Sequence, residues 1–175
     1  MSHLEAVILR KSPRREADLV FEVYSRQLGL THFQAKGVRR NGAKLKSGLD
    51  VFNLVEVDLV GSKYLPIVTD VRIVDSFSLV RSDLKCLRLA QAAAYILGKS
   101  VEPNWPEMEL WRQTLNYFRQ INNPTATAVQ LRHSVYEWCY QFLRLNGLAT
   151  PPPRDEVLIS RLFRNDYGID LAKLL

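Results

Sequence analysis

The feature that most constrains this chain is a change in the spacing of its apolar residues near residue 77. Before that point apolar and polar side chains alternate, as they do along a half-buried β-strand; after it, apolar residues recur every three to four positions, as on one face of a helix. The change predicts an α+β protein, with a β domain over residues 1–78 followed by an all-helical domain over residues 79–175.

The alternating half of the chain contains five strand-like runs. These are Leu4–Leu9, Ala17–Tyr24, His32–Lys36, Phe52–Val60 and Leu65–Val74, with a turn at Gly61-Ser62 between the last two. Five strands in about 75 residues fit a small barrel, and we expect the OB architecture, in which long loops flank the binding face. An SH3-like barrel fits almost as well.

The second half predicts a series of helices. One begins near Leu84 with Ser82 as its N-cap, and the next contains Trp111 and Leu115 and is capped by Asn104. A long helix is expected from about Thr125 to Asn146, ending at Gly147. Its buried residues are expected to be Val129, Leu131, Val135, Trp138, Cys139, Phe142 and Leu145. Pro151–Pro153 form a stiff connector, followed by short helices at Glu156–Phe163 and Asp170–Leu175.

Charge points to a polyanionic partner. The net charge is +6, and no acidic residue occurs between Glu22 and Asp50. That window includes a loop with three glycines, Ala35–Gly48, where close backbone approach and basic side chains suit a phosphate chain. The candidate DNA-binding residues are Lys11, Arg14, Arg15, Arg26, Lys36, Arg39, Arg40, Lys44 and Lys46. The alternatives are a solvated flexible loop, and pairing of Arg14 and Arg15 with Glu16 and Asp18.

Binding of single strands also requires flat side chains on which bases stack. Tyr24 and His32 fall on the strand faces opposite Phe21 and Phe33, so both are candidate stacking residues. The competing interpretation of Tyr24 is a partly buried tyrosine with a structural role.

Other functional classes find no support in the sequence. Two cysteines, Cys86 and Cys139, and three dispersed histidines do not assemble a zinc site, and we expect neither metal nor cofactor. The chain has no P-loop and no Gly-x-Ser-x-Gly motif, so we do not expect an enzyme. Without a signal-peptide pattern or an apolar run near 18 residues, a cytoplasmic, nucleoid-associated protein is expected.

Six short motifs carry a family resemblance. They are Glu5–Arg10 (EAVILR), Glu16–Val20 (EADLV), Arg26–Gly29 (RQLG), Ala35–Arg40 (AKGVRR), Leu45–Phe52 and Asp75–Phe77 (DSF). In this order and spacing they resemble the N-terminal OB domain of the RecO family of recombination mediators. Residues 83–147 are similar to that family's helical domain, with Phe142–Leu148 in the place of its helix-ending LLxxLG pattern.

The resemblance implies a DNA repair protein that binds single- and double-stranded DNA and anneals complementary strands. Its implied partners are the ring-forming RecR, the C-terminal tail of single-strand-binding protein and, indirectly, RecA. The tail would enter an apolar pocket of the helical domain, for which the candidate residues are Trp111, Arg112, Leu115, Arg119, Arg132 and Trp138.

Two departures from the family are expected. Pro151–Pro153 stand where many members carry a four-cysteine zinc site, and the chain is shorter than the family norm. Two other functions stay open. The chain could be a general OB-fold binder of single-stranded RNA or DNA, or an adaptor that binds proteins.

Overall fold

The computed structural model describes residues 2–39, 45–61, 65–148 and 155–174, and these divide into two compact units. The first unit comprises Met1–Phe77 together with Val101–Glu107, and the second comprises Ser78–Ser100 together with Met108–Leu175. The segment Val101–Glu107 therefore groups with the β unit, although the sequence pattern places it among the helices.

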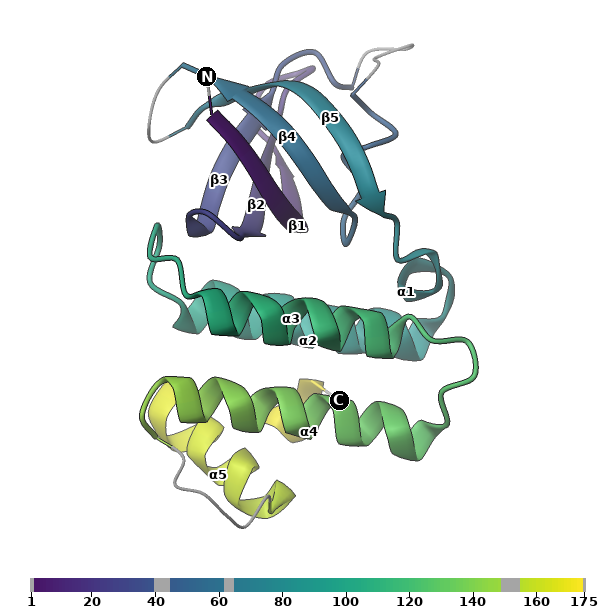
Figure 1. The fold of residues 1–175 in the computed structure, drawn as a ribbon, viewed down its shortest axis with the longest axis vertical. Coiled ribbons are helices and arrows are strands. Elements are labelled where there is room, and N and C mark those ends of the chain that lie inside the picture. The colour runs from purple at the N-terminus through teal and green to yellow at the C-terminus, as the bar shows by residue number, and fades with distance from the viewer. Residues whose placement is uncertain (1, 40–44, 62–64, 149–154, 175) are drawn as a thin grey trace. The chain divides into compact units, whose positions relative to one another are not determined.

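The first unit is a closed five-stranded barrel (Figure 1). Its strands are β1 (Ser2–Pro13), β2 (Leu19–Ser25), β3 (Gly29–Ala35), β4 (Leu54–Val60) and β5 (Ile67–Asp75). They close in the order β1-β2-β3-β5-β4, and only the β3–β5 pair, which joins Gln34 to Ile67, is parallel. The closed barrel followed by helices confirms the predicted α+β fold with an OB barrel.

The barrel core follows from strict alternation along the strands. Phe21 and Phe33 face each other across β2 and β3 with ring centroids 5.4 Å apart, and neither side chain is exposed. Burying two phenylalanines contributes roughly 1.5–3 kcal/mol each. The outward residues of the same strands, such as Glu22 and His32, are left to form a surface.

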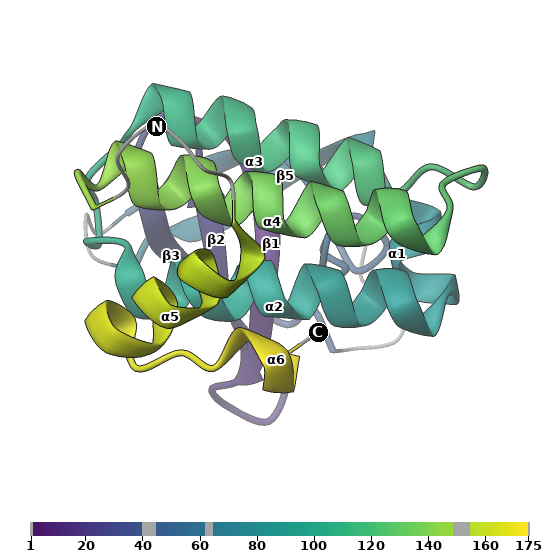
Figure 2. The same cartoon turned by 90° about the horizontal axis from the view of Figure 1, so that it is seen from below.

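The second unit is helical. Its elements are α1 (Ser78–Ser82), α2 (Leu84–Ser100), α3 (Met108–Ile121), α4 (Ala128–Leu145), α5 (Glu156–Tyr167) and α6 (Leu171–Leu174). Figure 2 shows α4 alongside α3, with α5 and α6 packed near α2 and α4. Aromatic rings fill the core. Trp138 stacks on Tyr117 with ring centroids 5.4 Å apart, and the ring centroids of Phe142 and Phe163 are 5.8 Å apart.

The helix ends differ in part from the prediction. Asp83, and not Ser82, caps α2, because its carboxylate accepts hydrogen bonds from the backbone N–H groups of Lys85 and Cys86. Asn104 does not cap a helix: α3 begins at Met108, and Asn104 lies in the preceding loop with φ of 58°. The predicted ending of α4 is confirmed, since Gly147 adopts φ of 74° and Leu148 donates to the carbonyl of Leu143.

The start of α4 lies slightly later than predicted. Thr127 forms a capping box with Gln130, so Val129 falls in the first turn, where it is 78% exposed, and its predicted burial is wrong. The Pro151–Pro153 connector lies outside the described residues. Within the described part of the chain, no helix combines the length and apolar character needed to cross a membrane.

Candidate nucleic-acid interface

Hydrogen bonds gather two loops at one end of the barrel. The β1–β2 loop and the segment after β3 are joined by Arg39 N–H to the Ala17 carbonyl (3.1 Å) and by Gly37 N–H to Asp18 Oδ1 (2.8 Å). A third segment, residues 45–53, is fixed to β1 where Phe52 N–H donates to the Ile8 carbonyl (2.7 Å). We call this end the basic rim, after its cationic residues Lys11, Arg14, Arg15, Lys36, Arg39 and Lys46.

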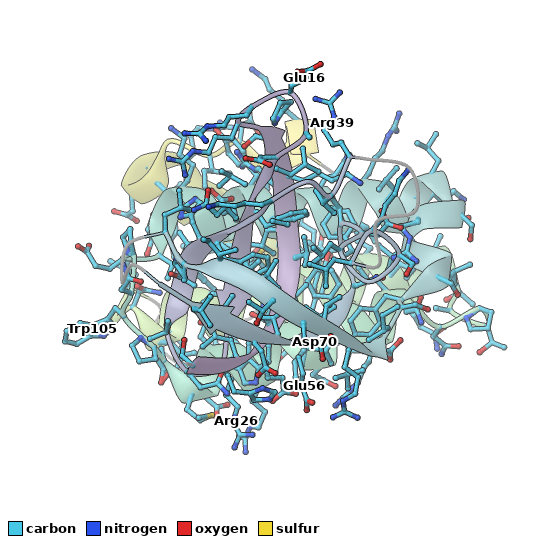
Figure 3. All side chains as sticks on the ribbon, turned by 90° about the horizontal axis from the view of Figure 1, so that it is seen from above. Glu16, Arg26, Arg39, Glu56, Asp70 and Trp105 are labelled. Carbon is cyan, nitrogen blue, oxygen red and sulfur yellow. The ribbon has the colours of Figure 1, made fainter. Side chains whose placement is uncertain are left out.

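Acidic groups neutralise only part of the basic rim. Lys11 pairs with Asp50 at 3.1 Å, and Arg14 donates to the amide oxygen of Gln34 at 3.2 Å. The other four side chains are exposed, and among the residues with a described placement none of them has a carboxylate within 4.0 Å; they are Arg15, Lys36, Arg39 and Lys46. Arg39 does lie beside Glu16, as Figure 3 shows, without an ion pair between them.

Three of the predicted DNA-binding residues are not part of this described cluster. Arg26 lies in the β2–β3 turn at the opposite end of the barrel, where it forms an ion pair with Glu5 at 3.5 Å (Figure 3). Arg26 is therefore not part of the basic rim. Arg40 and Lys44 lie outside the described residues.

The glycines of the loop serve packing as well as charge presentation. A Cβ atom at Gly48 would lie 2.7 Å from the Val71 side chain, so glycine here lets the loop pack against β5. Gly37 adopts φ of 66°, which L residues with side chains rarely adopt, and this turn directs the chain from β3 towards Arg39.

The two predicted stacking residues have different environments. Tyr24 has no exposed surface, and burial raises the pKa of its hydroxyl, so a base has no access to the ring and its assignment as a stacking residue is withdrawn. His32 keeps 43% of its side chain exposed and lies 3.5 Å from Glu22. It remains a candidate.

Arg10 is a surface cation that the sequence reasoning missed. It occupies the row Arg10–Glu22–His32 across β1, β2 and β3, and its guanidinium lies 3.6 Å from Glu22. Alternation gave no signal for it. Ala6 and Ile8 face the core, and a shift in strand register between Ile8 and Arg10 places Arg10 on the outer face.

Residues 1–77, which form this barrel, match the family described as recombination protein O N terminal. The barrel domain therefore belongs to the RecO N-terminal family. The DNA repair protein RecO of Desulfitobacterium hafniense is 27% identical over 76% of this chain and 49% of its own length. The RecO of Listeria monocytogenes is 24% identical over 70% of this chain and 48% of its own length.

A third RecO relative shares more residues over a shorter stretch. The protein from Cutibacterium acnes is 33% identical over 57% of this chain and 42% of its own length. The chain thus spans about half the length of the curated RecO proteins that it matches. The resemblance inferred from the six motifs is confirmed.

Half of the six pocket residues inferred from the RecO resemblance are core residues. Trp111, Leu115 and Trp138 are buried, and the Trp138 indole donates to Thr114 Oγ1 at 3.2 Å. They are not among the residues that line the open groove described below, and their burial leaves little surface for a ligand. Arg112 is paired with Glu109 at 2.7 Å, and Arg119 is exposed on α3.

An open groove does exist, but between α2 and α4. It has a volume of about 370 Å³ and an apolar floor formed by Leu89, Leu131 and Val135. Lys85, Arg88 and Arg132 lie around it. Of the six predicted pocket residues, Arg132 alone lines this α2–α4 groove. Lys85 and Arg88 were missed because both lie on α2, and most of the residues that complete the groove lie on α4, distant in sequence.

Arg132 is held in place by its neighbours. Its guanidinium binds Glu156 at 2.6 Å and lies 5.7 Å from the ring centroid of Tyr136. The Glu156 hydrogen bond raises the pKa of Arg132, which is therefore a fixed positive charge. Among the described residues, no group of three or more His, Cys, Asp or Glu side chains could hold a metal ion.

Proposed function

We propose that this chain acts in recombinational DNA repair by binding single- and double-stranded DNA at the basic rim. It brings complementary strands together for annealing and assists the loading of a recombinase. The match of its barrel to the RecO family, and the similarity of the chain to RecO proteins named as DNA repair proteins, support the biological setting.

The observation that carries the proposal is the set of exposed rim cations for which the described residues provide no side-chain partner, Arg15, Lys36, Arg39 and Lys46. A cation already paired with a carboxylate gains little from a phosphate, whereas an unpaired one releases a condensed counterion from the DNA. Annealing makes and breaks no covalent bond. When cations neutralise phosphates on two strands, the strands repel each other less and can pair.

The α2–α4 groove suits the tail of single-strand-binding protein, the partner implied by the family. Leu89, Leu131 and Val135 would receive an apolar terminal side chain, and Lys85 and Arg88 would meet the acidic groups of the tail. RecR and, indirectly, RecA complete the proposed set of partners.

Annealing of complementary oligonucleotides, bare or coated with single-strand-binding protein, tests the proposed function. The wild-type protein is expected to accelerate annealing of both substrates. A quadruple variant is expected to lose most of that acceleration; its substitutions are Arg15→Ala, Lys36→Ala, Arg39→Ala and Lys46→Ala. Circular dichroism controls for folding. A variant that anneals as fast as the wild type would remove the rim from the mechanism.

Binding of a labelled acidic, phenylalanine-ended peptide tests the groove separately. Arg88→Ala is expected to weaken binding about tenfold, because a charge-assisted hydrogen bond contributes roughly 1.5–3 kcal/mol. Lys99→Ala is the matched control, since Lys99 is exposed near the other end of α2 and does not line the groove. Equal effects of the two substitutions would argue against the groove.

A general single-strand binder is the second candidate, favoured by the barrel and the rim alone. Such a protein would bind bare oligonucleotides, but coating them with single-strand-binding protein would not favour its binding. A protein adaptor would show neither activity.

A further inference from the structure

One tryptophan lies on the surface and takes no part in the core. Trp105 is 69% exposed, whereas Trp111 and Trp138 are 4% and 3% exposed. Leaving an indole in water forgoes the largest apolar burial that a side chain offers. Figure 3 shows the Trp105 side chain projecting outward from the barrel unit.

The backbone that carries Trp105 is fixed to the start of β3. Asn104 N–H donates to the Leu30 carbonyl at 2.8 Å, and the Asn104 side chain accepts from the Thr31 hydroxyl at 2.9 Å. Pro103 and Pro106, on either side, restrict the loop further. The Trp105 carbonyl lies so close to Gly29 that a Cβ there would be 2.3 Å from it. The indole is thus exposed on a firmly held backbone.

Trp105, His32 and the basic rim follow one another along β3. Trp105 lies against Gly29, the first residue of the strand, and His32 lies in the middle of the strand. Lys36 and Arg39 of the rim come after its last residue, Ala35. At about 3.3 Å per residue, Gly29 and Lys36 are roughly 23 Å apart along the strand. That length matches the several nucleotides that one OB domain binds.

We propose that Trp105 is a base-stacking platform at the far end of a single-strand path that starts at the basic rim and runs along β3. This inference rests on the proposed function and supplies the aromatic contact that Tyr24, being buried, cannot provide. Glu102 and Glu107 flank Trp105 in sequence, so the contact is to the face of a base and not to a phosphate.

Intrinsic fluorescence gives a direct test, because the exposed indole responds to a stacked base while the two buried indoles do not. A single-stranded oligonucleotide is expected to quench the emission of the wild-type protein, and Trp105→Ala is expected to abolish the quenching. Trp105→Ala should also weaken single-strand binding about fivefold or more, and Trp105→Phe should retain part of the affinity. Duplex DNA serves as an internal control, since its paired bases are not available and its affinity should not change.

Salt dependence separates stacking from phosphate contact. Trp105→Ala should lower single-strand affinity at every salt concentration and leave the log–log slope unchanged, whereas Arg39→Ala should flatten the slope by roughly 0.7. Quenching and affinity that survive in Trp105→Ala would overturn the stacking role while leaving the proposed function intact. If Trp105→Ala lowers affinity for RecR and not for DNA, the indole is a protein contact and the inference is wrong. If the wild type binds no single strand at all, both the inference and the proposed function fail.

Discussion

Two glycines with the same left-handed backbone have different surroundings. Gly29 and Gly168 have φ of 64° and 65°, but only Gly29 lies against another segment, the Trp105 carbonyl. At Gly168 an added Cβ would meet nothing within 4 Å. The pair therefore separates the cost of backbone conformation from the cost of displacing the Trp105 loop.

Substitution of both glycines by alanine is expected to give unequal losses of stability. Gly168→Ala should cost about 1–2 kcal/mol, the penalty of a left-handed L residue. Gly29→Ala should cost more and should also reduce the oligonucleotide-induced quenching, because the loop must move. Chemical denaturation with fluorescence measures both. Equal losses of stability, with quenching retained, would show that the loop is not fixed through Gly29.

Single residues show where sequence reasoning reaches its limit. Alternation along β2 correctly assigned Tyr24 to the face opposite Phe21, but it could not show that the same face is covered there. Trp105 escaped notice because it lies between two prolines, outside any periodic pattern. Whether a side chain is exposed depends on residues distant in sequence, and periodicity carries no information about them.

At the scale of elements, the start of α2 depends on one carboxylate. Asp83 accepts from two backbone N–H groups, and the bond from Cys86 lowers its pKa below the usual 3.8. The stabilisation is fully present above the unfolded-state pKa and is lost as the pH falls through the lower folded-state value.

Asp83→Ala is therefore expected to lower Tm at pH 7 by a few degrees, and the gap to the wild type should narrow as the pH falls below 3.8. Asp83→Asn is the control, since asparagine also caps helices but cannot titrate. Thermal unfolding followed by circular dichroism measures the gap. A gap that is the same at pH 7 and at the lowest pH would contradict the capping role.

Elements were easier to predict than their ends. All five strands and the main helices follow from apolar periodicity, which depends on many residues at once. Caps depend on one side chain, and Ser82 and Asp83 are both good N-cap residues that differ by one position. The choice between them depends on which backbone N–H groups the first turn presents.

At the scale of the whole molecule, the barrel unit separates its charges. The strand pairs Glu5–Glu56 and Asp58–Asp70 place four carboxylates on the outer face of β1, β4 and β5. Figure 3 shows Glu56 and Asp70 towards the side of Arg26 and away from Arg39. If the rim binds DNA as proposed, this face offers less attraction, because Arg26 and Arg72 are already paired with Glu5 and Glu56.

This separation was only partly visible in the sequence. The acid-free window includes Lys36, Arg39 and Lys46, which have no carboxylate partner among the described residues. It also includes Arg26, whose partner Glu5 lies outside the window. A linear window counts neighbours along the chain, whereas electrostatics depends on neighbours in space. The α2–α4 groove was missed for the same reason, since its cations come from two helices.

The central claim is that unpaired cations at the basic rim, and not the net charge of +6, bind DNA. Its most direct test is the salt dependence of single-strand affinity for two double variants that remove the same charge. Arg39→Ala with Lys46→Ala removes unpaired rim cations, and Arg26→Ala with Arg72→Ala removes cations paired with Glu5 and Glu56. We expect the rim variant to flatten the log–log slope by about 1.4 and the control to leave it unchanged. Equal slopes for the two variants would contradict the account.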